Sequence, residues 1–188
     1  PPRAKLAFRI VAEVLVIAAA LAVQDPRERP LERAQAADAA QKMFADEQSD
    51  FLGYLKLWKF FADGLHHESN RKLHQACRDH FLSFSRMREW RDVHAQLKEL
   101  AAELGWKAGD IKPDSGQYAR VHRALLTGLL GNVGLRADDG SYQGARGIKI
   151  WVHPGSALVK KAPRWIMAAE LTETTRLFAR SVAGIEPE

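Results

Sequence analysis

With 188 residues, the chain has room for one sizeable domain or two small ones. Its hydrophobic share of 46% and charged share of 27% are ordinary globular values, and its net charge of +5 permits a nucleic-acid partner without requiring one. Cys77 is the only cysteine, which excludes an internal disulfide and fits a reducing compartment such as the cytoplasm.

The first predicted element is a buried helix in the apolar run from Val14 to Val23. These ten residues are too few for a membrane span, which needs about 20. The stretch also lacks the pattern of a secretory signal. Pro26 and Pro30 then interrupt the helical pattern, so we expect a turn between them.

Further helices are predicted for Leu31–Ala45 and Asp50–Phe61. The first is rich in alanine at helical spacing. In the second, the apolar residues fall on one face, which predicts packing on a core, and Gly64 is the expected helix stop. The residues on that face are Leu52, Leu55, Trp58 and Phe61.

The stretch from Ser69 to Leu97 predicts two helices that meet near Ser83 and Ser85. The apolar stripe of the first is Leu73, Cys77 and Phe81, and that of the second is Trp90, Val93, Leu97, Leu100 and Leu104.

Arg88, Arg91 and Lys98 fall on the opposite side of the second helix. A row of cations suits a polyanion such as a phosphate backbone. A solvated helix face with no ligand explains the same row. The nearby histidines do not have metal-ligand spacing, so we expect no metal site; they are His66, His67, His74 and His80.

A connecting loop is predicted for Gly105–Gln117 and a helix for Tyr118–Leu130. From Asn132 the periodicity changes from 3.6 to 2 residues. Asp139-Gly140 predicts a hairpin turn between strands Asn132–Ala137 and Ser141–Arg146. Further strands are expected at 148–153, before Pro154, and at Trp165–Thr174 and Arg176–Ile185. Five short strands suit a small barrel of the OB or the SH3-like type.

Four stretches together resemble the C-terminal part of DEAH-box RNA helicases, most of all the bacterial HrpA type. They are EVLVIAAALAVQDPRERP, CRDHFLSFSRMREWRDVHAQL, HPGSALVKKAPRW and AELTETTRLFARSVAGIEPE. The resemblance runs from Glu13 to Glu188, whereas Pro1–Glu13 looks shorter than the matching passage of the family and supports no functional expectation.

The resemblance implies an α+β chain: a helical helicase-associated (ratchet) domain over residues 1–117, and a leading helix plus a five-stranded OB-like barrel over residues 118–188. It also implies a role in guiding single-stranded RNA, or possibly DNA, over the motor domains. The motor and winged-helix domains of the same polypeptide would be partners, and no membrane is involved.

The residues expected to face RNA are cations, histidines and one serine. The resemblance implies Arg86, Arg88, Arg91, His94, His153 and Ser156, and the basic barrel adds Arg146, Lys149, Lys160 and Lys161. In the turn His153-Pro154-Gly155-Ser156, the glycine allows a ligand close to the backbone and the serine offers a hydroxyl. A tight structural turn beside a solvated lysine pair fits the same residues.

No complete catalytic site is evident in the sequence. Neither G-x-x-x-x-G-K-[ST] nor D-E-x-H occurs, so we expect this chain to bind no cofactor and to hydrolyse no ATP. ATP and Mg²⁺ would belong to the motor domains of the parent helicase, and no metal ligands are assigned here.

The charge distribution favours the barrel end, from Tyr118 onward, as the RNA-binding part. From Tyr118 onward the net charge is +4, against +1 for the preceding 117 residues. Trp151 and Tyr142 are candidates for stacking on bases, although barrel packing explains them equally well. A second hypothesis is a docking module for activator proteins with little RNA affinity of its own; binding of a bare oligonucleotide would favour the first.

Overall fold

The computed structural model describes residues 10–186. They form two compact units. The first unit contains residues 10–45 and Tyr54–Pro113, and the second contains Asp46–Gly53 and residues 114–186. The domain ranges expected from the sequence stay predictions. The structure adds that the short segment Asp46–Gly53 belongs with residues far along the chain.

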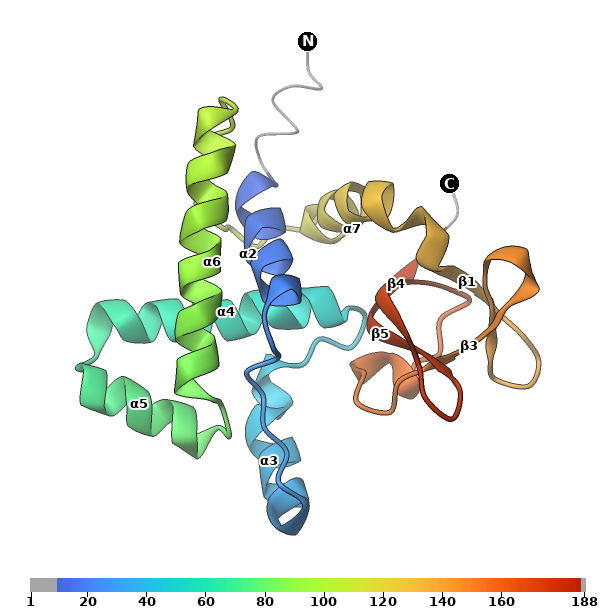
Figure 1. The fold of residues 1–188 in the computed structure, drawn as a ribbon, viewed down its shortest axis with the longest axis horizontal. Coiled ribbons are helices and arrows are strands. Elements are labelled where there is room, and N and C mark those ends of the chain that lie inside the picture. The colour runs from blue at the N-terminus through green and yellow to red at the C-terminus, as the bar shows by residue number, and fades with distance from the viewer. Residues whose placement is uncertain (1–9, 187–188) are drawn as a thin grey trace. The chain divides into compact units, whose positions relative to one another are not determined.

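The first unit is helical, and α2 lies beside α6 (Figure 1). None of the helices within residues 10–186 combines the length and the apolar content that crossing a membrane requires. The elements up to residue 113 are α2 (Val11–Ala22), η1 (Leu31–Arg33), α3 (Ala34–Gln41), η2 (Lys42–Phe44), α4 (Asp50–His67), α5 (Asn70–Asp79) and α6 (Phe84–Glu103).

Trp90 is the centre of the helical core. Its side chain is fully buried, and its indole N–H donates to the carbonyl oxygen of Val16 at 3.0 Å. The rings of Tyr54 and Trp58 lie against it, with centroids 6.1 and 5.3 Å away. A buried aromatic of this size with a satisfied polar atom stabilises the contact between α2, α4 and α6 strongly.

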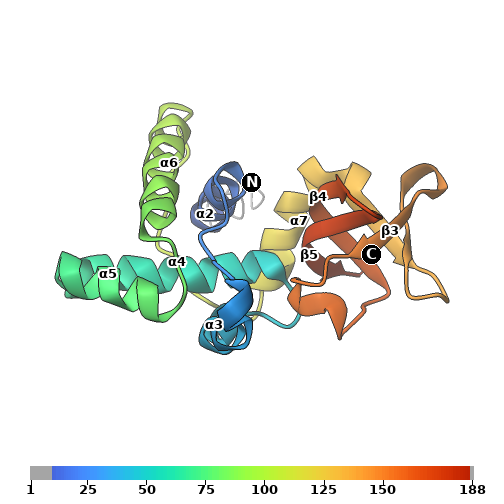
Figure 2. The same ribbon diagram turned by 60° about the horizontal axis from the view of Figure 1, so that its bottom comes forward.

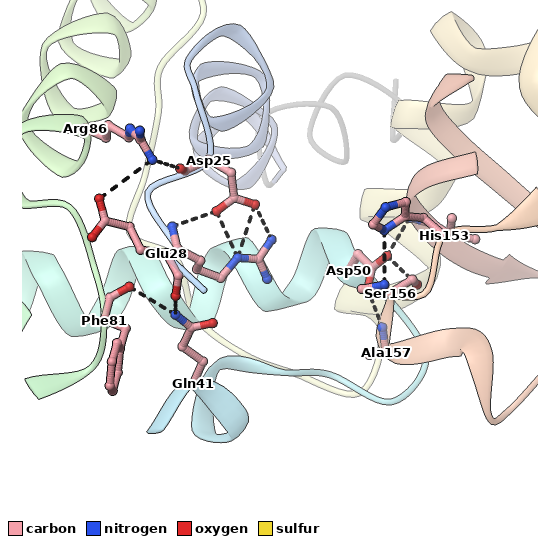
Figure 3. Close-up of polar contacts among 12 residues, drawn as sticks. Asp25, Glu28, Gln41, Asp50, Phe81, Arg86, His153, Ser156 and Ala157 are labelled. Carbon is pink, nitrogen blue, oxygen red and sulfur yellow. Dashed lines mark hydrogen bonds and ion pairs between the residues drawn. The ribbon is translucent and has the colours of Figure 1, made fainter. Parts of the chain in front are cut away.

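The proline-containing break is held by backbone pairing. The N–H of Glu28 donates to the carbonyl of Phe81, and the N–H of Ser83 donates to that of Pro26, both at 2.8 Å. The side-chain amide of Gln41 lies within 3.0 Å of the carbonyls of Glu28 and Phe81 (Figure 3). Phe81 has a φ of 53° and follows the end of α5, so the expectation that it continues a helical stripe was wrong.

Gly64 does not end α4, which continues to His67. A Cβ at this position would lie 2.5 Å from Cδ1 of Leu73, so the glycine lets the buried Leu73 of α5 approach the helix closely. The expected stop was therefore wrong, because close helix packing and not helix termination requires the glycine.

The stripe of α6 is buried only in its first part. Trp90 is fully buried and Val93 and Leu97 are half-buried, but Leu100 and Leu104 are 55% and 68% exposed. The last two residues of the predicted apolar stripe therefore do not lie on the core.

The second unit is a closed five-stranded barrel preceded by a helix, which confirms the α+β class. The strands follow the order β1-β2-β3-β5-β4, β1 also pairs with β4, and β3 and β5 are parallel. The helix α7 lies against the barrel at β4 (Figure 2). The elements are α7 (Gln117–Leu129), η3 (Leu130–Asn132), β1 (Val133–Arg136), β2 (Tyr142–Gln143), η4 (Ala145–Gly147), β3 (Lys149–Val152), η5 (Ala157–Val159), β4 (Trp165–Glu173) and β5 (Leu177–Ile185).

The Asp139-Gly140 hairpin is confirmed. β1 and β2 pair antiparallel, and Gly140 adopts a φ of 81°, which favours glycine. The second strand is shorter than predicted, because it ends at Gln143 and η4 follows. Inward-facing side chains fill the barrel: Tyr142, Ile150, Leu158, Ile166, Ala168, Ala179 and Val182.

Residues Gln48–Asp50 are held against β5. Ser49 forms a β-bridge with Ala183, and the N–H of Gly184 donates to the carbonyl of Gln48 at 3.1 Å. The hydroxyl of Tyr118 lies 2.5 Å from the carbonyl oxygen of Gly184, and burial raises its pKa to about 12. These contacts explain why a segment so far away in sequence belongs to the barrel unit.

His122 on α7 completes this contact. It is 4% exposed, and its Nδ1 lies 2.6 Å from the carbonyl of Tyr118, so Nδ1 carries the proton. Its Nε2 therefore accepts a hydrogen bond from the hydroxyl of Ser49 at 2.6 Å. Burial lowers the pKa of His122, against smaller effects of the Tyr118 carbonyl and Asp46.

We expect acid to destabilise the barrel unit through His122. Because the folded-state pKa lies below the unfolded value of 6.5, stability is full above pH 6.5 and falls as pH drops through the folded-state pKa. Thermal unfolding between pH 8 and pH 5 should show this fall, and His122→Gln should reduce it. The control His66→Gln, at an exposed histidine, should not. An unchanged pH dependence in His122→Gln would contradict the assignment.

Candidate nucleic-acid interface

The outer face of β3 and β5 carries aromatic and basic side chains together. Side chains alternate along a strand, and Ile150 and Ala179 are buried in the barrel. Their neighbours therefore point outward, and Trp151 pairs in register with Phe178. We call this surface the β3–β5 face, and it consists of Lys149, Trp151, His153, Arg176, Phe178 and Arg180.

Trp151 is half-buried, and two cations lie near its ring. The guanidinium carbon of Arg176 is 4.4 Å from the ring centroid, and Nζ of Lys149 is 5.6 Å away. Cations over an indole are attracted by the negative potential of the ring. The arrangement puts positive charge beside an aromatic surface, the combination that binds the phosphates and the bases of a single strand.

Lys149 also forms an ion pair with Asp139 of the β1–β2 hairpin. Asp139 accepts two further hydrogen bonds from Ser141, one from its N–H at 3.0 Å and one from its hydroxyl at 2.5 Å. The hydrogen bond with Lys149, followed by those of Ser141, lowers the pKa of Asp139. The lysine is thus oriented toward the hairpin, in an exposed ion pair of the kind that contributes little stability.

His153 directly follows β3 and lies beside Phe178, with ring centroids 5.7 Å apart. Its Nδ1 accepts the N–H of Gly155 at 3.0 Å, so Nε2 holds the proton of the neutral ring. Burial, followed by the charge of Arg180, lowers the pKa of His153, while Asp50 opposes this. At neutral pH His153 therefore offers an N–H donor and an aromatic edge, and no full positive charge.

Ser156 is already engaged within the protein. Its hydroxyl donates to Oδ2 of Asp50 at 2.6 Å (Figure 3). It also accepts the N–H of Leu158 at 3.2 Å. The hydroxyl proton is therefore used in holding the turn. Contact of Ser156 with RNA stays a prediction, but the structure gives the side chain a role in the turn.

The other basic residues of the barrel unit that were expected at RNA differ in their surroundings. Lys161 forms an ion pair with Glu47 at 2.7 Å. Lys160 is exposed, and so is Arg146, which lies in η4 with a φ of 56°.

In the helical unit, α6 supplies the other residues expected at RNA. Arg86 donates to the carbonyl of Asp25 at 3.2 Å and lies 3.9 Å from Glu28 (Figure 3). Arg91 pairs with its neighbour Asp92 at 2.8 Å.

Arg88 and His94 on the same helix have different environments. Arg88 is exposed. The ring of His94 lies against Trp58, with centroids 4.5 Å apart. Burial, followed by the charge of Lys98, lowers the pKa of His94, so it is a weak candidate for a cationic contact. Arg88 is therefore the α6 candidate with the most accessible charge.

Two findings about aromatic and basic residues differ from the sequence reasoning. Tyr142 is 1% exposed and its hydroxyl donates to the carbonyl of Pro163 at 2.7 Å, so it cannot stack on a base. Arg176, Phe178 and Arg180 were missed. The alternating pattern of β5 could have indicated them, but only with the parallel register that places Phe178 beside Trp151.

The described part of the chain brings no three histidine, cysteine, aspartate or glutamate side chains together in a way that could hold a metal ion.

The sequence of the chain is similar to a known domain family and to several helicases. Residues 121–188 match the model of the oligonucleotide/oligosaccharide-binding (OB)-fold. Over 95% of its length the chain is 41% identical to the ATP-dependent RNA helicase HrpA of Escherichia coli, and over 96% it is 42% identical to the HrpA homologue of Haemophilus influenzae. The splicing helicase prp22 of Schizosaccharomyces pombe is 28% identical over 94%.

The chain spans only 14% of the length of each of these relatives. The match extends through both units, since nearly the whole chain aligns with the two bacterial proteins. The chain is therefore homologous to a segment of HrpA-type ATP-dependent RNA helicases, and its residues 121–188 belong to the OB-fold family.

Proposed function

We propose that this chain is the accessory nucleic-acid-binding region of a DEAH-box RNA helicase, and that it guides single-stranded RNA over the motor domains. The observation that supports this most is the β3–β5 face, where Trp151 and Phe178 pair in register beside Arg176 and Arg180. A cationic surface with aromatic platforms binds single strands with little sequence preference.

The chemistry of ATP hydrolysis is proposed to lie outside this chain. The 188 residues contain no phosphate-cradling loop and no D-E-x-H sequence, so they do not fit ATP and Mg²⁺. The motor and winged-helix domains of the same polypeptide are the proposed neighbours, and this region contributes RNA contacts to their work.

A protein-docking role is a second candidate because of the end of α6. Leu100, Leu104 and Trp106 are 55%, 68% and 53% exposed, and the backbone folds back there through a hydrogen bond from Trp106 N–H to the carbonyl of Ala101. Clustered exposed apolar side chains mark interaction surfaces. Failure of the whole chain to bind a bare oligonucleotide at low salt would favour this candidate.

RNA binding should depend on salt because phosphates are neutralised. Log affinity for oligouridine should fall with log salt by about 0.7 for each phosphate contacted. Arg176→Ala with Arg180→Ala should weaken binding and reduce this slope. Arg71→Ala with Lys112→Ala removes two exposed cations of the helical unit and is the matched control. Equal losses in both double variants, measured by fluorescence anisotropy, would show that only net charge matters.

Trp151 should contribute by stacking. Trp151→Ala should cost about 1–3 kcal/mol of binding free energy, which is the usual range for one base on an aromatic ring. The salt slope should stay nearly constant because no phosphate contact is lost. Trp151→Phe should recover part of the affinity, and Trp106→Ala, at an exposed tryptophan of the helical unit, should have no effect. Wild-type affinity in Trp151→Ala would place the RNA elsewhere.

A further inference from the structure

The carboxylate of Asp50 accepts three hydrogen bonds within the barrel unit. Its Oδ2 accepts from the hydroxyl of Ser156 at 2.6 Å and from the N–H of Val182 at 2.8 Å, and its Oδ1 accepts from the N–H of Ala157 at 3.1 Å. Figure 3 shows the carboxylate facing the turn that carries His153 and Ser156. One side chain thus joins two separate parts of the barrel, the turn after β3 and the strand β5.

The backbone of β5 shows why such an anchor is needed. Ser181 has a φ of 50° in the middle of the strand. A non-glycine residue in this region is strained, and the surrounding contacts must hold it there. Asp50 binds the very next N–H, that of Val182, and so holds the strand in this conformation.

The turn and the strand that Asp50 holds each carry a residue of the β3–β5 face, close in sequence to the contact with Asp50. Arg180 precedes the strained Ser181. On the other side, His153 begins the turn that ends at Ser156, and the N–H of Ser156 donates to the carbonyl of His153 at 2.9 Å. A change at Asp50 would therefore move an outward-facing arginine and an outward-facing histidine together.

Only a carboxylate satisfies this arrangement. Each of its two oxygens is an acceptor, and together they accept from three donors. An asparagine would turn an NH₂ group toward either Ala157 N–H or the pair Ser156 and Val182. Two donors would then face each other, which leaves partly buried hydrogen-bonding groups unsatisfied.

We propose that Asp50 is a positioning residue for the RNA-binding face. It touches no RNA itself, but it fixes the turn from His153 to Ala157 and the bend of β5 at Ser181. This inference rests on the proposed function for its effect on RNA, whereas its effect on the turn can be measured without RNA.

The test uses the sign of the change in affinity. Asp50→Asn removes one negative charge, and general electrostatics alone would then strengthen RNA binding. Positioning predicts the opposite, a loss of several-fold in affinity for oligouridine. Asp138→Asn, at an exposed aspartate of the same unit, makes the same charge change and should bind RNA as tightly as the wild type or more tightly.

Amide NMR spectra of the whole chain provide the readout that needs no RNA. In Asp50→Asn the amide resonances of Ala157 and Val182 should shift strongly, with smaller shifts at His153 and Arg180, while the helical unit keeps its spectrum. Asp50→Glu should recover part of the RNA affinity because it keeps a carboxylate, and Asp50→Ala should not.

Two results would overturn the proposal. One is an Asp50→Asn chain whose amides at 153–157 and 180–182 match the wild type. The other is an Asp50→Asn chain that binds RNA as Asp138→Asn does. If the wild type itself failed to bind RNA, the proposed function would fall, and the amide spectra would still decide whether Asp50 holds the turn.

Discussion

The barrel unit depends on the pairing of Gln48–Asp50 with β5. Each of these residues is satisfied by a different part of the unit: the Gln48 carbonyl by Gly184, the Ser49 hydroxyl by His122, and the Asp50 carboxylate by Ser156, Ala157 and Val182. Buried polar groups are costly when they lose their partners. The segment therefore acts as part of the barrel unit, although the OB-fold match begins only at residue 121.

In the proposed function, the β3–β5 face would bind a single strand weakly. Of its cations, Lys149 pairs with Asp139, while Arg176 lies over Trp151. Exposed ion pairs and cation–π contacts of this kind are worth little individually. In the proposed function these contacts would be exchanged for contacts with phosphates at small cost, which would let a single strand move over the face.

Local patterns in the sequence predict much of the fold. Asp139-Gly140 predicts a hairpin because these two residues favour the turn conformation by themselves. The burial of Trp90 follows from the helical spacing of the apolar residues around it. The role of Gly64 could not be predicted from local sequence, because it depends on Leu73 of another helix. The glycine that suggested the end of a helix instead allows two helices to pack closely.

The site was less predictable than the fold because its contacts join distant residues. Phe178 becomes part of the interface only through its parallel register with Trp151. Tyr142 has an aromatic ring that could stack on a base, yet its side chain is buried in the core. Asp50 lies 106 residues before Ser156 in the sequence, and no local pattern links the two.

The central claim is that single-stranded RNA lies on the β3–β5 face. Photo-crosslinking of the whole chain to oligouridine containing 4-thiouridine, followed by mass spectrometry of the peptides, tests it most directly. We predict that crosslinks concentrate at Trp151 and Phe178, which lie next to each other in the parallel pair of strands. Crosslinks confined to α5 and α6, with none in β3 or β5, would contradict the account.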